Sequence, residues 1–259
     1  MLTLSDLPVI HPSAVIDPDA RLAASVEVGP HVVIEADVVI GENVRVLAGC
    51  VLHAGCRVAQ GCILGPYAVV GGLPMDSGFS GETSYAALEE DVVLREFVTV
   101  HRATGEGAET RVGRGTLAMS YAHISHNVIV GRRCTLTTSV QLGGHSQVGD
   151  DAVLGSGAML HQFCRVGTHA MYGAGSASNQ DVLPYSMARG NPAKHYRLNR
   201  VGLQRRGFTG ERYERLEQAI RAFRRGDEVR LAELAELSDD VQAMLAFRDG
   251  SRRGLCSFV

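Results

Sequence analysis

The chain of 259 residues contains no tryptophan, and only 5% of its residues are aromatic. Because large aromatic side chains supply much of the buried area of a conventional layered core, we expect this core to be built from smaller aliphatic side chains. Neither sign of charge is in large excess: the formal net charge of −3 gives no overall reason to expect binding to nucleic acid or to an anionic membrane.

The sequence also lacks long apolar runs. No stretch is long enough to span a bilayer, and Met1–Ile10 has neither the basic nor the apolar part of a signal peptide. We therefore expect a cytoplasmic protein without a transmembrane segment. The six cysteines do not indicate disulfides, because Cys50, Cys56 and Cys62 follow each other at the spacing of a repeat and are expected to be small buried thiols.

That repeat is six residues long. From Val9 onward, each unit has an aliphatic residue at its second place and Ala, Val or Cys at its last place. The second places of the first run are Ile10, Ile16, Leu22, Val28, Ile34, Ile40, Val46, Leu52, Val58, Leu64 and Val70. The phase returns at Leu88–Val100 and again from Val112 to Tyr172, with Ala118 and Tyr172 as its weakest members. One short strand per unit and three units per turn predict a parallel solenoid of about eight coils, roughly 40 Å long.

Two stretches without the repeat, 71–87 and 101–111, are rich in Gly and Ser/Thr and are expected to be functional loops that leave the coil at its corners. After Asp181 the spacing becomes helical, with Thr209 and Gly226 as the expected ends of one helix and Ser238 as the N-cap of another. The sequence thus predicts a β-solenoid domain over 1–183 and a small helical domain over 184–259.

Four of the histidines are expected to gather on one side of the solenoid. Ile124, Leu142 and Leu160 are 18 residues apart and should stack, and beside them lie His123, His126, His145 and His161. A neutral imidazole can act as a general base towards a hydroxyl, and Gly143–Gly144 could offer a backbone N–H to an oxyanion. Three imidazoles could instead hold Zn²⁺ with an open fourth position, as in a hydratase. Spacing alone leaves both possibilities open.

Several motifs resemble one family. They are V-T-V-H-R at Val98–Arg102, A-H-I-S-H at Ala122–His126, G-H at Gly144–His145, H-Q-F-C at His161–Cys164, Q-D-V-L-P-Y at Gln180–Tyr185 and R-R-G-F at Arg205–Phe208. Over almost its whole length the chain is similar to the bacterial UDP-N-acetylglucosamine O-acyltransferases. The resemblance implies an all-β fold, a left-handed parallel β-helix followed by a small α-helical C-terminal domain.

The resemblance also implies a homotrimer with active sites between neighbouring subunits. The reaction would transfer an acyl group, usually 3-hydroxylated, from acyl carrier protein to the 3-hydroxyl of UDP-N-acetylglucosamine, at the start of lipid A synthesis. The acyl-carrier-protein thioester is the donor substrate, and no metal or other cofactor is implied.

Carried over residue by residue, the resemblance makes His126 the general base and Gly144 the oxyanion donor. The residues implied in binding the sugar nucleotide or the donor are Asp76, His123, His145, His161, Gln162, Asn199, Arg205 and Arg206. Met171 and Ala174 fall where the family measures acyl-chain length.

Four positions depart from the family pattern: Gly78 replaces a loop Lys, Asn127 an Asp, Val201 a Glu, and Ala174 a Gly of long-chain enzymes. These changes leave the acceptor sugar and the acyl length open. Alternative interpretations are an enzyme for another nucleotide sugar, an acetyl-CoA-dependent enzyme suggested by Gly190–Lys194, a metal-dependent hydratase of the carbonic anhydrase type, and a non-catalytic solenoid.

Overall fold

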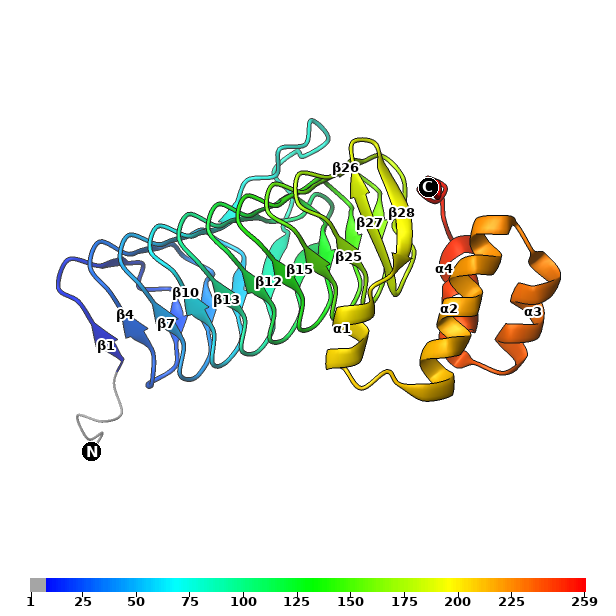
Figure 1. Ribbon diagram of the computed structural model, residues 1–259. Helices are drawn as coiled ribbons and strands as arrows, with labels where there is room; N and C mark the ends of the chain where they lie inside the picture. Colours follow the sequence, from blue (N-terminus) through cyan, green and yellow to red (C-terminus); the bar gives the residue numbers. More distant parts are fainter. Residues whose placement is uncertain (1–7) are drawn as a thin grey trace.

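The computed structural model describes residues 8–259, which form a three-sided coil of short parallel strands with four helices beyond its C-terminal end (Figure 1). The first sheet contains β1 (Val9–Ile10), β4 (Glu27–Val28), β7 (Arg45–Val46), β10 (Ile63–Leu64), β13 (Val93–Leu94), β16 (Leu117–Ala118), β19 (Thr135–Leu136), β22 (Val153–Leu154), β25 (Met171–Tyr172), β27 (Ser186–Gly190) and β28 (Ala193–Leu198). The second contains β2 (Val15–Ile16), β5 (Val33–Ile34), β8 (Val51–Leu52), β11 (Val69–Gly72), β14 (Thr99–His101), β17 (His123–Ile124), β20 (Gln141–Leu142), β23 (Met159–Leu160) and β26 (Ala177–Ser178). The third contains β3 (Arg21–Leu22), β6 (Val39–Ile40), β9 (Cys56–Val58), β12 (Tyr85–Leu88), β15 (Glu109–Val112), β18 (Ile129–Val130), β21 (Gln147–Val148) and β24 (Arg165–Val166).

The core is the column of aliphatic residues that the repeat predicts. Ile124 pairs with Leu142 and Leu142 with Leu160, so residues 18 apart lie directly above one another. Burial of the second place is almost complete from Val28 onward, whereas Ile10 in β1, the first strand within residues 8–259, is 43% exposed. The weak members Ala118 and Tyr172 are also fully buried, and the Tyr172 hydroxyl donates to the Met159 carbonyl (3.0 Å). All six cysteines are buried free thiols.

Three edges run along the coil where the sheets meet, and each has its own side chains. The tyrosine edge, between the first and second sheets, carries Tyr67, Phe97 and Tyr121, whose rings stack at 5.3 and 5.0 Å. The histidine edge, between the second and third sheets, carries His126, Asn127, His145 and Phe163. The arginine edge, between the third and first sheets, carries Arg133, Asp151 and His169.

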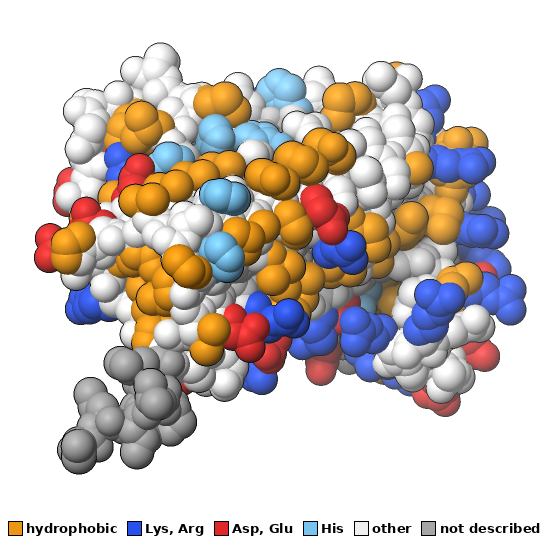
Figure 2. All heavy atoms as spheres, turned by 90° about the vertical axis from the view of Figure 1, so that its left-hand side faces the viewer, with side chains coloured by type: hydrophobic (Ala, Val, Ile, Leu, Met, Phe, Trp, Pro, Cys, Tyr) orange, Lys and Arg blue, Asp and Glu red, His pale blue; other side chains and the backbone are white. Residues whose placement is uncertain are grey.

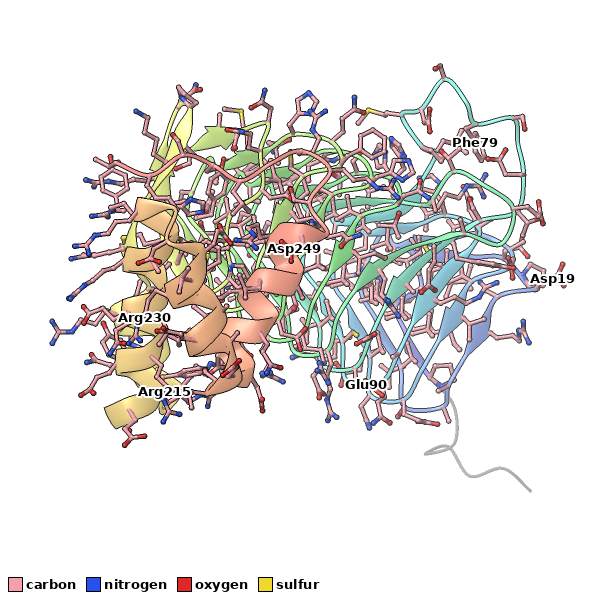
Figure 3. All side chains as sticks on the ribbon, turned by 90° about the vertical axis from the view of Figure 1, so that its right-hand side faces the viewer. Asp19, Phe79, Glu90, Arg215, Arg230 and Asp249 are labelled. Atoms are coloured by element: carbon pink, nitrogen blue, oxygen red, sulfur yellow. The ribbon has the colours of Figure 1, made fainter. Side chains whose placement is uncertain are left out.

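Both interruptions of the repeat occur at the histidine edge. Residues 73–84 connect β11 to β12 and residues 102–108 connect β14 to β15, so each links the second sheet to the third. The predicted loops 71–87 and 101–111 therefore include strand residues at their ends, because strands β11, β12, β14 and β15 are three or four residues long, whereas most strands of the coil have two. The first loop stands out from the coil, with Phe79 on it (Figure 3).

The C-terminal part begins with a hairpin that the sequence does not predict. Pro184, Gly190 and Pro192 indicate only a turn-rich exit, but β27 pairs with β25 and then, antiparallel, with β28, so the first sheet continues beyond residue 183.

Four helices follow the hairpin: α1 (Arg200–Arg205), α2 (Gly210–Arg225), α3 (Glu228–Glu236) and α4 (Asp239–Asp249). Thr209, Gly226 and Ser238 lie at the helix ends as predicted. The division at 183/184 stays a prediction. No helix within residues 8–259 has the length and apolar character needed to cross a membrane.

A buried histidine in this hairpin should make folding sensitive to acid. His195 is fully buried, accepts the Leu183 N–H at Nε2 (2.9 Å) and donates from Nδ1 to the Cys256 carbonyl (2.9 Å). Burial lowers the pKa of His195 to about 4, against roughly 6.5 in the unfolded chain. Between these values the unfolded chain binds a proton that the folded chain does not, so stability is complete above about pH 6.5 and falls towards pH 4.

We expect His195 to contribute about 2 kcal/mol to the loss of unfolding free energy between pH 7 and pH 5. His195→Gln keeps an amide donor and acceptor but cannot be protonated, so the same pH change should destabilise this variant less. Denaturant unfolding at both pH values measures the difference. An equal pH dependence in the two proteins would show that His195 does not contribute.

Candidate active site

The hydrogen bonds of His126 determine which of its nitrogens can act as a base. The residue follows β17 at the histidine edge and is 7% exposed, with Nδ1 3.0 Å from Asn127 Oδ1. That amide is oriented by the neighbouring loop, because Oδ1 also accepts the Thr104 N–H (2.9 Å) while Nδ2 donates to the Thr104 carbonyl (2.9 Å). An amide oxygen can only accept, so the proton of a neutral His126 lies on Nδ1 and the lone pair on Nε2.

Gly144 lies one coil further along, beside Nε2. A Cβ atom at this position would overlap Nε2 and Cε1 of His126, so only glycine leaves room for the imidazole. The Gly144 carbonyl accepts the Phe163 N–H (3.0 Å), whereas its own N–H makes no hydrogen bond within residues 8–259. A free backbone N–H next to a base is the arrangement needed to stabilise an oxyanion.

Asp76 reaches this pair from the loop that follows β11. Its Oδ2 lies 3.7 Å from His126 Nδ1, and its Oδ1 accepts the Gly78 N–H (2.9 Å). The latter bond is the main cause that lowers the pKa of Asp76, which is therefore ionised at neutral pH. Glu82 connects this loop to the second loop, residues 102–108, because its carboxylate accepts hydrogen bonds from the N–H groups of Gly105 (2.7 Å) and Ser80 (2.8 Å). These bonds lower the pKa of Glu82 to about 2.

Two further histidines, His145 and His123, lie near His126 and have lowered pKa values. The His145 ring meets the His126 ring edge-on at 5.2 Å and stacks on Phe163 at 4.8 Å, and burial and the nearby His126 lower its pKa. His123 Nδ1 is 2.7 Å from Thr99 Oγ1, and burial lowers the pKa of His123 to about 4. Both can donate or accept hydrogen bonds at pH 7 without carrying charge.

A groove of about 650 Å³ leads away from these histidines across the outer face of the second sheet. It is lined by Met75, His123, Ser125, Gln141, Leu142, Gly143, Met159, Leu160, His161, Ala177, Ser178, Asn179, Asn191 and Pro192. Figure 2 shows histidine side chains gathered between hydrophobic ones on one face of the molecule. His161 lies in the groove, while Gln162 is exposed at the repeat position of His126 and Gly144.

The remaining predicted site residues lie elsewhere in the same chain. Asn199 caps α1 by accepting the Gly202 N–H (3.2 Å) and donates to the His169 carbonyl (2.9 Å) at the arginine edge. Arg206 forms an ion pair with the buried Asp151 (2.7 Å), and Arg205 is exposed on α1.

Met171 lies in the first sheet and Ala174 at the tyrosine edge. The predicted residues therefore occupy all three edges, because an edge collects residues that hold the same position in successive coils, 18 residues apart where no loop intervenes. One chain brings together Asp76, His123, His126, Gly144, His145 and His161, but not the nucleotide and chain-length residues.

The sequence reasoning missed several groove residues. Gln141, Met159 and Ala177 follow His123 at 18-residue intervals, so the repeat that located the histidines could have found them. Asn191 and Pro192 were missed because their hairpin has no six-residue phase. A potential metal-binding set is present, but it is not the three imidazoles considered from the sequence: ligand atoms of Asp76, His126 and His145 lie within 4.8 Å of one another.

Comparison with known proteins gives a consistent result. Residues 181–256 match the family model described as UDP N-acetylglucosamine O-acyltransferase, domain 2, and residues 37–72 match the bacterial transferase hexapeptide model. The acyl-[acyl-carrier-protein]–UDP-N-acetylglucosamine O-acyltransferase of Stenotrophomonas maltophilia (strain K279a) is 44% identical over 96% of this chain and 97% of its own length. The Pseudomonas paraeruginosa (strain DSM 24068 / PA7) enzyme of the same name is 46% identical over 93% of this chain and 95% of its own.

Solved structures agree. The UDP-N-acetylglucosamine acyltransferase of Francisella novicida superimposes with a TM-score of 0.92 at 30% identity, covering 96% of this chain and 94% of that one. The acyltransferase of Bacteroides fragilis 9343 gives a TM-score of 0.91 at 33% identity, with 95% and 99% coverage. The predicted fold class is thereby confirmed: a left-handed parallel β-helix followed by a small α-helical C-terminal domain.

The contact between Gly144 and His126 can be tested directly. Gly144→Ala should displace the His126 imidazole, and a displacement of about 1 Å lowers a catalytic rate on the order of 100-fold. We expect this loss in kcat for the acyl transfer named for the relatives, with an unchanged circular dichroism spectrum. Full activity of a folded Gly144→Ala variant would contradict the arrangement described here.

Proposed function

The chain belongs to the UDP-N-acetylglucosamine O-acyltransferase family and is an acyl-carrier-protein-dependent acyltransferase of the first step of lipid A synthesis; we propose that His126 is its general base. The observation that carries this assignment is the hydrogen bond between Nδ1 of His126 and Oδ1 of Asn127 (3.0 Å). Because Asn127 holds the proton of a neutral His126 on Nδ1, the lone pair of Nε2 is directed to the place beside Gly144.

In the proposed reaction, Nε2 of His126 removes the proton of the sugar 3-hydroxyl while the hydroxyl oxygen attacks the thioester carbonyl. The carbonyl oxygen becomes negatively charged and is stabilised by the Gly144 N–H. When the tetrahedral intermediate collapses, the carbon–sulfur bond breaks and the imidazolium returns its proton to the leaving thiolate. The thioester supplies the activated acyl group, so this mechanism uses no metal or other cofactor.

Asp76 can supply the negative charge that the neutral amide of Asn127 does not provide next to His126. An imidazolium forms during the reaction, and the amide of Asn127 orients it but has no charge to stabilise it. The ionised Asp76 carboxylate lies 3.7 Å from Nδ1 and can supply that stabilisation. Asp76 would thus serve both the sugar and the base.

The groove suits an acyl chain. Its walls include the apolar side chains of Met75, Met159, Ala177 and Pro192, and it starts at the histidines and ends at the hairpin turn. His123, His145 and Gln162 would bind the polar part of the substrates near the base.

We further propose that the complete site forms between chains of a homotrimer. Asn199, Arg205 and Arg206 would bind the nucleotide from a neighbouring chain, because in one chain they lie at or near the arginine edge, away from His126. The chain-length residues Met171 and Ala174 would likewise come from a neighbour. Arg221, Arg224 and Arg225 on α2 offer a basic surface that fits an acidic carrier protein. We also place the enzyme in the cytoplasm.

The function can be tested by single-turnover mass spectrometry with UDP-N-acetylglucosamine and a series of acyl-carrier-protein thioesters. We expect transfer to the sugar, and a loss of about 100- to 10,000-fold in His126→Ala because general-base catalysis is removed. His11→Ala, which changes an exposed histidine in the first coil, is the control and should keep full activity. No transfer from any thioester by the folded wild-type enzyme would refute the assignment of this acceptor.

A mixing experiment tests the shared site. His126→Ala and Arg206→Ala should each be inactive alone, but co-expression should form mixed trimers in which some sites take an intact His126 from one chain and an intact Arg206 from its neighbour. Random assembly makes roughly a quarter of the sites intact. If both residues acted within one chain, the mixed protein would regain no activity.

A further inference from the structure

The end of the chain returns from the helices to the coil, where it is held firmly (Figure 1). Ser251 Oγ donates to Asp181 Oδ2 (2.8 Å), and the backbone of Asp181 bonds to Gly254 (2.8 Å) and Cys256 (2.9 Å). Cys256 is only 2% exposed, and the backbone of His195 bonds to Ser257 (2.8 Å) and Val259 (3.0 Å). The backbone of residues 251–259 is thus bonded along the wall of the β-helix.

One of these side chains reaches the groove. The Nη2 atom of Arg253 is 3.0 Å from Nδ1 of His161, which lines the groove. Within residues 8–259, no carboxylate lies within ion-pair distance of Arg253. Its Nε atom is buried and has no hydrogen-bond partner. The contact with His161 is therefore not part of a salt bridge at the surface.

The contact with Arg253 favours one position for the proton of His161. A guanidinium has donors only, so Nδ1 accepts in this contact and the proton of a neutral His161 is then on Nε2. The Gln162 carbonyl oxygen, 3.1 Å from the same Nδ1, favours the opposite arrangement, because it can only accept a proton. The two contacts thus favour different tautomers, and the one that Arg253 favours makes Nε2 of His161 a hydrogen-bond donor.

The repeat shows which substrate this donor meets. Ser125, Gly143 and His161 occupy the same position in successive coils, so His161 lies about 10 Å along the groove from the residue next to the base. The Nε2 atom of His126 lies beside Gly144, between these two levels, so His161 is on the side of the base towards which the groove runs. Around His161 the groove is formed by Ser178 and Asn179, on the side that leads to the hairpin turn.

We propose that Arg253 is a positioning residue for the acyl donor: it holds His161 as an Nε2–H donor to the thioester substrate in the groove. The proposal rests on the acyltransferase function proposed above and adds to it a residue from the far end of the chain. It also gives a functional reason for the fixed position of the C-terminal tail.

Steady-state kinetics give the first test. In Arg253→Gln we expect KM for the acyl-carrier-protein thioester to rise about tenfold, as for the loss of one charged hydrogen bond, while KM for UDP-N-acetylglucosamine stays within about twofold. Arg253→Lys retains a charged donor and should recover part of the loss. Arg252→Gln removes the same charge from the exposed neighbouring residue and should behave as wild type. An equal effect of Arg252→Gln, or a rise only in the sugar KM, would overturn the proposal.

The tautomer gives a second test that does not depend on activity. In protein labelled with ¹⁵N-histidine, with the His161 signals identified by their absence in His161→Asn, the wild type should show a protonated Nε2 and Arg253→Gln a protonated Nδ1. A protonated Nδ1 in the wild type would refute the role of Arg253. If the wild type showed the expected tautomer but transferred no acyl group, the proposed function would fail, while the contact between the two residues would stand.

Discussion

The structure depends on the hydrogen bonding of each coil to the next at a constant register. Val9 pairs with Glu27, and Ile124, Leu142 and Leu160 form a continuous column, so each advance of 18 residues returns to the same place on the cross-section, except where a loop lengthens the coil. Within a run of the repeat, a residue's number therefore fixes its edge or face. Chemistry along one edge requires residues at one repeat phase, and this is why the positions of His126, Gly144 and Gln162 in the chain are enough to recognise them as a set.

The same rule explains what the sequence could and could not predict. The column of buried aliphatic residues, the ends of α2 and the grouping of the histidines follow from local periodicity and capping. The hairpin from Ser186 to Leu198 does not, because its pairing is antiparallel and its residues have no six-residue phase. The contact of Arg253 with His161 joins positions 92 residues apart through the C-terminal tail, and no repeat connects them. The roles carried over from the family remain predictions about side chains that the structure only places.

The histidines around His126 are largely uncharged because of their positions on the coil. The imidazoles of His123 and His145 are partly withdrawn from water and lie close to other imidazoles, and both effects lower their pKa. A cluster of cationic rings would repel itself, whereas neutral rings can share hydrogen bonds. Of the carboxylates in residues 8–259, that of Asp76 lies within ion-pair distance of His126, so in the proposed mechanism the loop that carries Asp76 contributes to the base as the coil beneath it does.

Both long loops leave the coil at the histidine edge, and this location has a physical consequence for the departures from the family pattern. A loop inserted at an edge does not break the columns of the three faces, so its sequence can change without loss of the fold. Gly78, which stands where the family has a lysine, uses its N–H to hold Asp76 in a turn. Asn127, which stands where the family has an aspartate, is bonded on both sides of its amide to Thr104 of the second loop. A carboxylate at position 127 would face the Thr104 carbonyl without a proton to donate. The amide and the loop conformation therefore depend on each other, and Asp76 is the residue that places a negative charge within 3.7 Å of His126.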